Sequence, residues 1–391
     1  MKNPRIVLIL LLLAFCRPAS FAQTEELKFL TVFEHGKDGR PDYRIPALVV
    51  SKHGTLLAFA EGRQTLSDHA QNDIVLKRSV DEGKTWGYLQ VVHEAGSNVL
   101  VNPCAVVLDS GRILLMYQCF PAGYHSRSLG TNILRLTPGL KGDAVSLTLL
   151  RFSDDDGATW SPPRNVTRQT KRPTEVTSTT SGPGIGIQLQ RGRHKGRILI
   201  PTSESWWVGD RRSNNATVCF SDDGGKTWRR SQPARDNAGV DSEMQVVELS
   251  DGSVLLNARS SHGHQCRKVA LSRDGGETWS PLRDEPQLPE PECMGSILRY
   301  SWPESGASRI LFSNPASTTG RTNGVVRLSL DEGQTWPVSR TIEPGGFAYS
   351  CLALLPNGEI GLLFEANDYQ QIKFVHFTLG WLRDPGSPPP R

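Results

Sequence analysis

The chain has 391 residues, of which 37% are hydrophobic and 21% are charged. This composition suits a soluble protein with a large core, and it excludes a membrane-embedded or a disordered chain. The 37 glycines and 26 prolines indicate a fold with many turns. No long helical periodicity is visible beyond the first residues.

The first 22 residues have the pattern of a secretory signal peptide. Lys2 and Arg5 give a basic start, residues 6–15 form an apolar run, and a small-residue exit ends at Ala22. We expect cleavage after Ala22 and export, either to a periplasm or out of the cell. The apolar run is short for a stable anchor, so we expect no integral membrane segment in the remaining chain. A lipoprotein anchored through Cys16 is the weaker alternative, because a bulky side chain precedes that cysteine.

Loss of the signal peptide also changes the charge argument. It removes Lys2, Arg5 and Arg17, so the 44 basic residues become 41, against 40 acidic residues. A chain this close to neutrality gives no electrostatic reason to expect a nucleic-acid partner. We expect a monomer that needs no cofactor.

Six cysteines remain after the signal peptide, and an exported protein can pair some of them, in a pattern that the sequence leaves open. The six are Cys104, Cys119, Cys219, Cys266, Cys293 and Cys351. The order His262-x-His264-x-Cys266 is the nearest approach to a metal-binding motif. A loop with polar tips is the favoured interpretation, so we expect no metal site.

The first predicted strands are residues 29–33, 42–50 and 54–60. Arg44 lies at the head of the second strand, which is otherwise apolar. A charge at a strand end is the simple structural explanation. The third strand runs into Arg63 and a polar loop that contains Asp68, and loops on a rigid β scaffold often carry function.

Further strands and turns follow in the middle of the chain. Residues 98–117 read as two strands, with Asn102 in the first of them. Residues 182–187 are rich in glycine, but they neither follow a Rossmann-type strand nor open a helix, so we predict a tight loop near a cleft and no nucleotide site.

The second half of the chain reads as hairpins that end in charged residues. Residues 241–249 and 254–259 form a predicted hairpin that brings Glu243 and Arg259 to the same end. Arg321 lies in a polar stretch after it. The last predicted hairpin begins near Tyr349 and ends near Glu365. A final strand at 372–379 closes the domain, and residues 384–391 form a Pro-rich tail.

One pattern, Ser-x-Asp-x-Gly-x-Thr-Trp, occurs five times. Its copies start at Ser79, Ser153, Ser221, Ser272 and Ser329, which lie 74, 68, 51 and 57 residues apart. Recurrence on this scale indicates a repeated supersecondary unit. The Asp can accept backbone hydrogen bonds and the Gly can take positive φ, so each copy predicts a hairpin turn that the Trp packs against. A catalytic group is not needed five times, so we interpret these Asp residues as structural.

The repeat spacing also predicts an architecture. At about 60 residues per unit, about 360 residues give roughly six units, within the usual range for a β-propeller. We therefore expect an all-β, six-bladed β-propeller over residues 23–383, with the repeats at its hairpin turns.

The repeats and the polar residues between them resemble the sialidase (neuraminidase) superfamily, whose members carry this repeat as the Asp box. The resemblance spans nearly all of the chain after the signal peptide. Asp boxes also occur in other propellers, including non-catalytic lectins, so the residues between the boxes carry the specificity.

The resemblance implies an arginine clamp for the substrate carboxylate. Its members here are Arg44, in Arg44-Ile45-Pro46, with Arg259 after the Glu-led hairpin and Arg321 before the last box. Sialic acid carries a carboxylate on its anomeric carbon. Guanidinium groups bind carboxylates in a planar, bidentate manner and stay charged at any relevant pH.

The resemblance also implies the catalytic residues. Tyr349 matches the nucleophile, Glu243 the base that accepts its proton, and Asp68 the acid/base at the leaving oxygen. A neutral phenol suits a carbon that already bears a negative group, because a carboxylate nucleophile would be repelled. Sialidases with a tyrosine nucleophile are known exceptions to the two-carboxylate rule for glycosidases.

Three further residues match supporting positions of the family. Glu365 matches the acid that braces Arg44, and Arg63 matches a binding residue near O4 of the sugar. Asn102 stands where many bacterial members place an Asp contact. Each of these residues alone has a structural explanation, and the whole set in family order favours the functional one.

The expected function is that of a retaining exo-α-sialidase acting on sialylated glycoconjugates through a tyrosyl-enzyme intermediate. A sialic-acid-binding propeller without turnover is the alternative from another class. Such a lectin could lose the nucleophile, its base or the acid, and all three are present here. Trans-sialylation or release of an anhydro product stays open, because it depends on aromatic residues that one sequence does not place.

Overall fold

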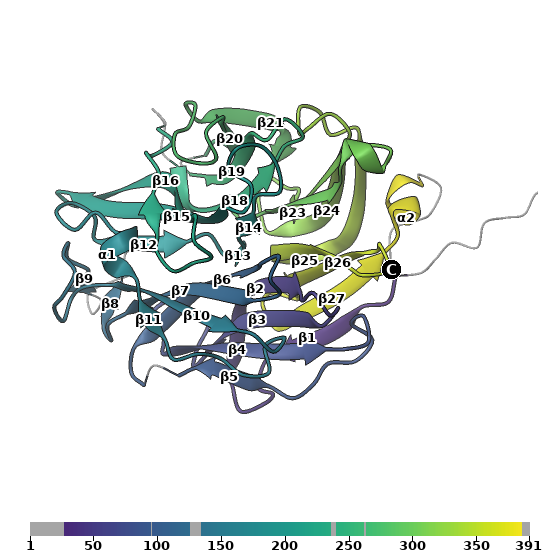
Figure 1. Cartoon of the computed structure of the whole chain (residues 1–391). Coiled ribbons are helices and arrows are strands. Elements are labelled where there is room, and N and C mark those ends of the chain that lie inside the picture. Colours follow the sequence, from purple (N-terminus) through teal and green to yellow (C-terminus); the bar gives the residue numbers. More distant parts are fainter. Residues whose placement is uncertain (1–26, 95, 126–133, 236–239, 262, 385–391) are drawn as a thin grey trace, which may run out of the picture.

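The computed structural model of this chain describes residues 27–94, 96–125, 134–235, 240–261 and 263–384. The predicted signal peptide and most of the predicted Pro-rich tail lie outside the described residues. The regular secondary structure of the described part is almost entirely β-strand, and Figure 1 shows its sheets following one another in chain order around the molecule.

A nine-stranded sheet holds the first strands of the ring. Its main path is β11-β10-β7-β6-β4-β3-β2, with β5 beside β4 and β13 parallel to β6. The strands are β2 (Asp42–Val50), β3 (Leu56–Arg63), β4 (Asn72–Ser79), β5 (Gln90–His93), β6 (Val99–Val107), β7 (Ile113–Phe120), β10 (Leu147–Ser153), β11 (Arg164–Asn165) and β13 (Gly184–Ile185).

Two smaller sheets continue the ring, in the orders β12-β15-β16-β17, with β14 beside β15, and β18-β19-β20-β21. These strands are β12 (Ser178–Ser181), β14 (Ile187–Gln188), β15 (Ile198–Val208), β16 (Arg211–Ser221), β17 (Arg229–Arg230), β18 (Val240–Glu248), β19 (Val254–Ser260), β20 (Cys266–Ser272) and β21 (Arg283–Pro289).

A seven-stranded sheet, β1-β27-β26-β25-β24-β23-β22, completes the circle, and in it the N-terminal β1 pairs with the C-terminal β27. Its strands are β1 (Leu30–Glu34), β22 (Ser296–Ser301), β23 (Arg309–Pro315), β24 (Thr322–Ser329), β25 (Val338–Leu354), β26 (Ile360–Ala366) and β27 (Gln371–Phe377). Outside these sheets are β8 (Tyr124–His125), β9 (Leu134–Arg135), helices α1 (Thr167–Thr170) and α2 (Leu379–Arg383), and the short 3-10 helix η1 (Pro303–Ser305).

The predicted all-β propeller class is confirmed by this ring of sheets. The number of six blades stays a prediction, because two of the sheets are continuous where separate blades would end. One runs through β25, which is 17 residues long, and the other through a contact between Asn72 of β4 and Val99 of β6. None of the described helices is long and apolar enough to cross a membrane.

All five Asp boxes have the predicted turn geometry. In the box that follows β16, the Ser221 hydroxyl donates to Asp223 at 2.8 Å, and the Gly225 amide donates to Ser221 at 2.9 Å. The Thr227 amide and hydroxyl both donate to the Asp223 carboxylate, at 2.8 and 2.6 Å. The same four bonds recur in the other copies, which are centred on Asp81, Asp155, Asp274 and Asp331.

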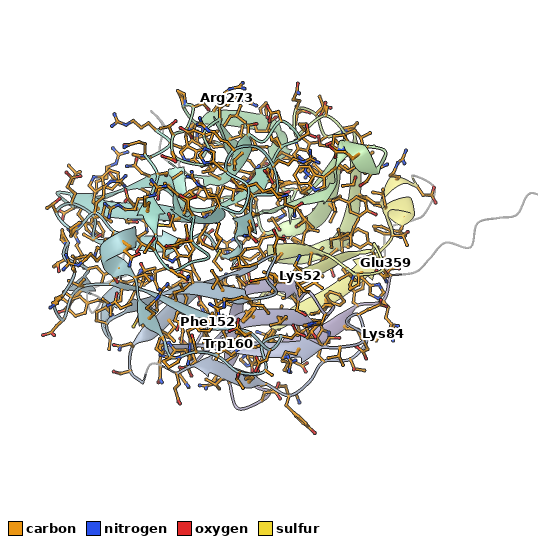
Figure 2. All side chains as sticks on the ribbon, in the orientation of Figure 1. Lys52, Lys84, Phe152, Trp160, Arg273 and Glu359 are labelled. Atoms are coloured by element: carbon orange, nitrogen blue, oxygen red, sulfur yellow. The ribbon has the colours of Figure 1, made fainter. Side chains whose placement is uncertain are left out.

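The boxes also join neighbouring sheets. Gly225 has a φ of 84°, and a Cβ atom there would lie 2.6 Å from Leu114 of the preceding sheet. Gly83, Gly276 and Gly333 approach the preceding sheet in the same way, whereas Gly157 approaches Leu57 within its own nine-stranded sheet. The box tryptophans reinforce these contacts, as where Trp160 packs edge-on against Phe59 at 5.7 Å. Figure 2 shows Trp160 close to Phe152, the residue before its box.

The register places the boxes at one end of the strands and the charged residues at the other. The β4 residue Ser79, which opens the first box, pairs with Leu56. At the far end of the same two strands, Arg63 pairs with Asn72. The β2 residue Asp42, beside Arg44, also pairs with Arg63. The turn machinery and the candidate site therefore lie on opposite faces of the ring.

The six cysteines do not form disulfides, and all six are buried as free thiols. In the sequence His262-x-His264-x-Cys266, His264 pairs with Asp284 at 3.0 Å, and His262 lies outside the described residues. Within the described ranges, no group of three or more His, Cys, Asp or Glu side chains could hold a metal ion.

The box geometry makes a testable prediction for Asp223→Ala. Because this removes the acceptor for Ser221 and for both Thr227 donors, we expect a loss of about 1–3 kcal/mol in the free energy of unfolding. We expect any turnover to stay within about twofold, since the box lies on the face away from the site. Chemical denaturation measures the change, with the exposed Asp143→Ala as the matched control. A larger effect on turnover than on stability would contradict the structural role.

Candidate functional site

Arg44 and Glu365 form a buried pair that joins β2 to β26. The Arg44 Nε donates to Glu365 Oε1 at 2.7 Å and an Nη donates to Oε2 at 3.3 Å, so the pairing is bidentate. The predicted bracing of the first arginine by Glu365 is therefore present as a contact. A bidentate pair fixes the guanidinium plane as well as its position.

The backbone next to Arg44 is strained and is held by the same carboxylate. Ile45 has a φ of 61°, although it is β-branched and precedes Pro46, and both properties disfavour that conformation. Its amide donates to Glu365 Oε1 at 2.8 Å, and the Tyr349 amide donates to Oε2 at 3.2 Å. Glu365 thus fixes Arg44, the strained residue and the backbone of Tyr349 together.

Glu243, Arg259 and Tyr349 are in mutual contact. The Tyr349 hydroxyl donates to Glu243 Oε1, and an Arg259 Nη donates to Glu243 Oε2 at 2.7 Å. The same Nη lies 3.2 Å from the Tyr349 oxygen. The predicted β18–β19 hairpin accounts for this arrangement, because Met244 pairs with Ala258, which sets Glu243 beside Arg259.

The third arginine, Arg321, completes the group. Its guanidinium carbon lies 5.3 Å from the centre of the Tyr349 ring, and that of Arg44 lies 5.4 Å from it. Arg321 donates to the Tyr369 hydroxyl at 3.1 Å and to the Glu292 carbonyl at 3.2 Å. All three predicted arginines therefore gather around one buried tyrosine.

The Tyr349 phenol is held in its protonated form. Its side chain is 4% exposed. Burial raises its pKa well above the ordinary value, and the Glu243 carboxylate raises it further, although Arg259 and Arg321 oppose both effects. The hydroxyl therefore needs a partner that takes its proton before it can act as a nucleophile, and Glu243 is in hydrogen-bonding contact with it.

Asp68 and Arg63 lie together in a pocket that Tyr349 and Glu243 also line. Arg63 donates to Asp68 Oδ1 at 3.0 Å, and the Asp68 side chain is 43% exposed. The pocket that contains them is lined by Ile45, Glu61, Arg63, Asp68, Val101, Asn102, Phe120, His125, Thr180, Glu243 and Tyr349. The structure thus brings Asp68, Arg63 and Asn102 to the same hollow as Tyr349 and Glu243.

Asn102 lines this pocket from a left-handed conformation, with a φ of 56°. Its side-chain amide donates to the Ser181 carbonyl at 2.9 Å, and its backbone amide donates to Glu61 at 2.7 Å. Asparagine tolerates this conformation better than most residues, which explains the residue type without a role in binding.

Glu61 and Tyr369 belong to the site but were not predicted. Glu61 is fully buried, its Oε2 accepts the Arg63 Nε at 2.8 Å, and burial raises its pKa against the opposing charge of Arg63. Glu61 lies two residues before Arg63 on the same strand, so both side chains are on the same face of the sheet. This spacing in the sequence therefore indicates that Glu61 lies beside Arg63. Tyr369 lies 4.1 Å under the Arg44 guanidinium, and its turn carried no comparable signal.

The comparisons with known proteins agree with this arrangement. A family model described as a BNR repeat-like domain matches residues 54–362. The chain is 37% identical to a sialidase of Micromonospora viridifaciens, in an alignment that covers 89% of this chain and 53% of that protein. It is 31% identical to sialidase-2 of Cricetulus griseus, in an alignment that covers 86% of this chain and 92% of that protein. This chain belongs to the sialidase family.

Solved structures of the sialidase family share the fold. A Hadza microbial sialidase is 30% identical, with a TM-score of 0.78 over 90% of this chain and 68% of that one. An intramolecular trans-sialidase from Ruminococcus gnavus is 22% identical and also has a TM-score of 0.78, over 90% of this chain and 98% of that one. The chain spans between half and two thirds of the length of the sialidases from Micromonospora and Bacteroides fragilis, at 53% and 61%.

The buried phenol of this sialidase-family site makes a pH prediction. Because the folded pKa of Tyr349 is raised, its neutral form stabilises the fold below the ordinary tyrosine pKa of about 10, and that contribution falls as the pH rises further. We therefore expect the ultraviolet tyrosinate absorbance of the wild type and of Tyr349→Phe to coincide up to about pH 10. One extra tyrosinate in the wild type below that pH would show that the phenol ionises readily.

Proposed function

We propose that this chain is a retaining exo-α-sialidase that removes terminal α-linked sialic acid from glycoproteins, glycolipids and oligosaccharides. The observation that carries the proposal is the surroundings of the Tyr349 side chain. Its hydroxyl is hydrogen-bonded to Glu243, and Arg44, Arg259 and Arg321 lie around it. The family membership supports the same activity.

The three arginines suit the substrate carboxylate. Arg44 and Arg259 each have a carboxylate partner, at 2.7 Å in both cases, while Arg321 donates to a hydroxyl and a carbonyl. The guanidinium groups are therefore fixed in place before a substrate arrives. An incoming carboxylate gains charge-assisted hydrogen bonds without a large cost of ordering the side chains.

Tyr349 then attacks the anomeric carbon while Glu243 takes the phenolic proton. The glycosidic bond breaks, and Asp68 gives its proton to the leaving oxygen. In the second half, Asp68 takes a proton from water, the water oxygen attacks the anomeric carbon, and the bond to Tyr349 breaks with return of the proton from Glu243. Two displacements retain the configuration.

The partly exposed Asp68 suits the acid/base role because leaving group and water must both reach it. Its contact with Arg63 at 3.0 Å, in turn held by the buried Glu61, orients the carboxylate toward the pocket. Asn102 lines the same pocket and is available to contact the sugar. The proposal also includes export directed by residues 1–22, action as a monomer, and turnover without a cofactor.

The experiment that tests the function follows release of a fluorescent alcohol from its α-sialoside, with NMR of the freed sugar. We expect free sialic acid, formed first as the α-anomer because the configuration is retained. Binding of sialic acid without release would support a lectin instead. A first-formed β-anomer would contradict the tyrosyl intermediate, and an anhydro sugar would place the chain with the intramolecular trans-sialidases.

Tyr349→Phe tests the nucleophile. Loss of the attacking oxygen should lower kcat by about 10³-fold or more, as expected for a group that forms a bond in the transition state. The fold should survive, because the ring and its packing are kept. The matched control is Tyr117→Phe, which removes another buried hydroxyl, bonded to His93 at 2.8 Å, and should retain turnover. Full activity of Tyr349→Phe would remove this residue from the mechanism.

Arg321→Lys tests the clamp. Lysine keeps the charge but loses the planar pair of donors, so KM should rise about 10- to 100-fold while kcat falls less. Steady-state kinetics with the same fluorogenic substrate give both constants. Arg112→Lys is the control, because Arg112 makes a bidentate pair with Asp154 at the surface. Unchanged KM in Arg321→Lys would contradict the assignment of the clamp.

A further inference from the structure

A fully buried ion pair contacts the segments next to two arginines of the site. Glu290 follows β21, Arg267 lies on β20, and both side chains have no exposed surface. An Arg267 Nη donates to Glu290 Oε2 at 3.1 Å. Burial of two charges is costly and does not by itself stabilise a fold, so such a pair calls for another explanation.

The Glu290 carboxylate accepts hydrogen bonds from the backbone amides of two separate segments. Its Oε1 accepts the Ser260 amide at 2.5 Å and the Ser260 hydroxyl at 2.8 Å. Its Oε2 accepts the Cys293 amide at 2.9 Å in addition to Arg267. One side chain therefore holds the end of β19 and the segment that follows β21 at a fixed separation.

One of these segments adjoins Arg259 in the sequence, and the other contacts Arg321. Ser260 is the residue after Arg259. The Cys293 amide belongs to the same peptide unit as the Glu292 carbonyl, which accepts Arg321 at 3.2 Å. In a trans peptide the N–H and the C=O point in opposite directions. A carboxylate that holds the N–H of this unit therefore aims its carbonyl at Arg321.

The peptide unit needs such support because its backbone is strained. Glu292 has a φ of 55°, a conformation that residues other than glycine rarely adopt. Arg267 holds the segment from the other side, since the same Nη donates to the Cys293 carbonyl at 2.7 Å and its Nε donates to Asn257 on β19 at 2.7 Å. Cys293 in turn packs in the cluster that contains Tyr349.

We propose that Glu290 is a positioning residue that sets the separation and direction of Arg259 and Arg321, and so the fit of the clamp to a carboxylate. This inference rests on the proposed function for the identity of the ligand. Glu290 does not line the pocket that holds Tyr349, so its effect passes through Ser260 and the peptide of Glu292.

The chemistry of the position requires a carboxylate. All four groups that face Glu290 are donors: the amide and hydroxyl of Ser260, the amide of Cys293, and Arg267. A glutamine of the same size has one acceptor oxygen, so its NH2 group would face donors on one side. One of the two segments would then shift.

Glu290→Gln is the first test, with Glu248→Gln as its matched control. Glu248 is also a buried carboxylate that holds two backbone amides, those of Gln190 and Arg191, but it lies at the opposite end of β18 from Glu243. For Glu290→Gln we expect kcat/KM to fall about 10- to 100-fold, mainly through KM, as for a misplaced binding group. We expect the control to keep its kinetic constants.

The decisive measurement compares the affinity for sialic acid with that for its methyl ester, by calorimetry. A positioning role should reduce the preference for the free acid about 10-fold in Glu290→Gln and leave it unchanged in Glu248→Gln. An unchanged preference in Glu290→Gln, with only a lower melting temperature, would overturn the proposal. An equal reduction in both variants would overturn it as well.

A second variant and the wild type distinguish a folding defect from failure of the proposed function and from failure of the positioning role. If Glu290→Gln does not fold, Glu290→Asp retains the charge but is one methylene shorter, and it should show the same loss of preference for the acid. If the wild type releases no sialic acid, the proposed function fails. The acid-to-ester preference of the variants then still decides whether Glu290 positions the clamp.

Discussion

Two buried guanidinium groups and a third, partly buried one around a single phenol form the constraint on which the rest of this structure depends. A charge taken out of water is tolerated only where compensating groups are fixed in place. Glu365 compensates Arg44, and Glu243 compensates Arg259. These partners come from four different strands, β2, β26, β18 and β19, so the site exists only when the ring of sheets is assembled.

The residues that stabilise the fold and the residues of the candidate site lie on opposite faces of the ring. At one face the Asp boxes form turns with the same four hydrogen bonds, and each brings a glycine close to a leucine or phenylalanine of another strand. At the other face the charged residues of the site lie beside strained backbone, as at Ile45 and Glu292. Such strain persists because the boxes and the core between the sheets hold the strands independently of it.

The local parts of this structure could be predicted from the sequence. The boxes are turns because their Ser, Asp, Gly and Thr bond to one another within eight residues, and the hairpin turn alone sets Glu243 beside Arg259. The remote parts could not. Tyr369 and Glu290 act through partners on other segments, and structural and functional Asp and Glu residues look alike in a single sequence. The cysteines, for which pairing was open, are separate buried thiols.

The pairing of β1 with β27 has a consequence for how the molecule is made. Thr31 and Lys373 are register partners, so the first strand meets its neighbour only after nearly the whole chain has been synthesised. Until then the ring has two unpaired edges and an exposed apolar interior, a state prone to aggregation. Folding of this chain is therefore completed by its last strand.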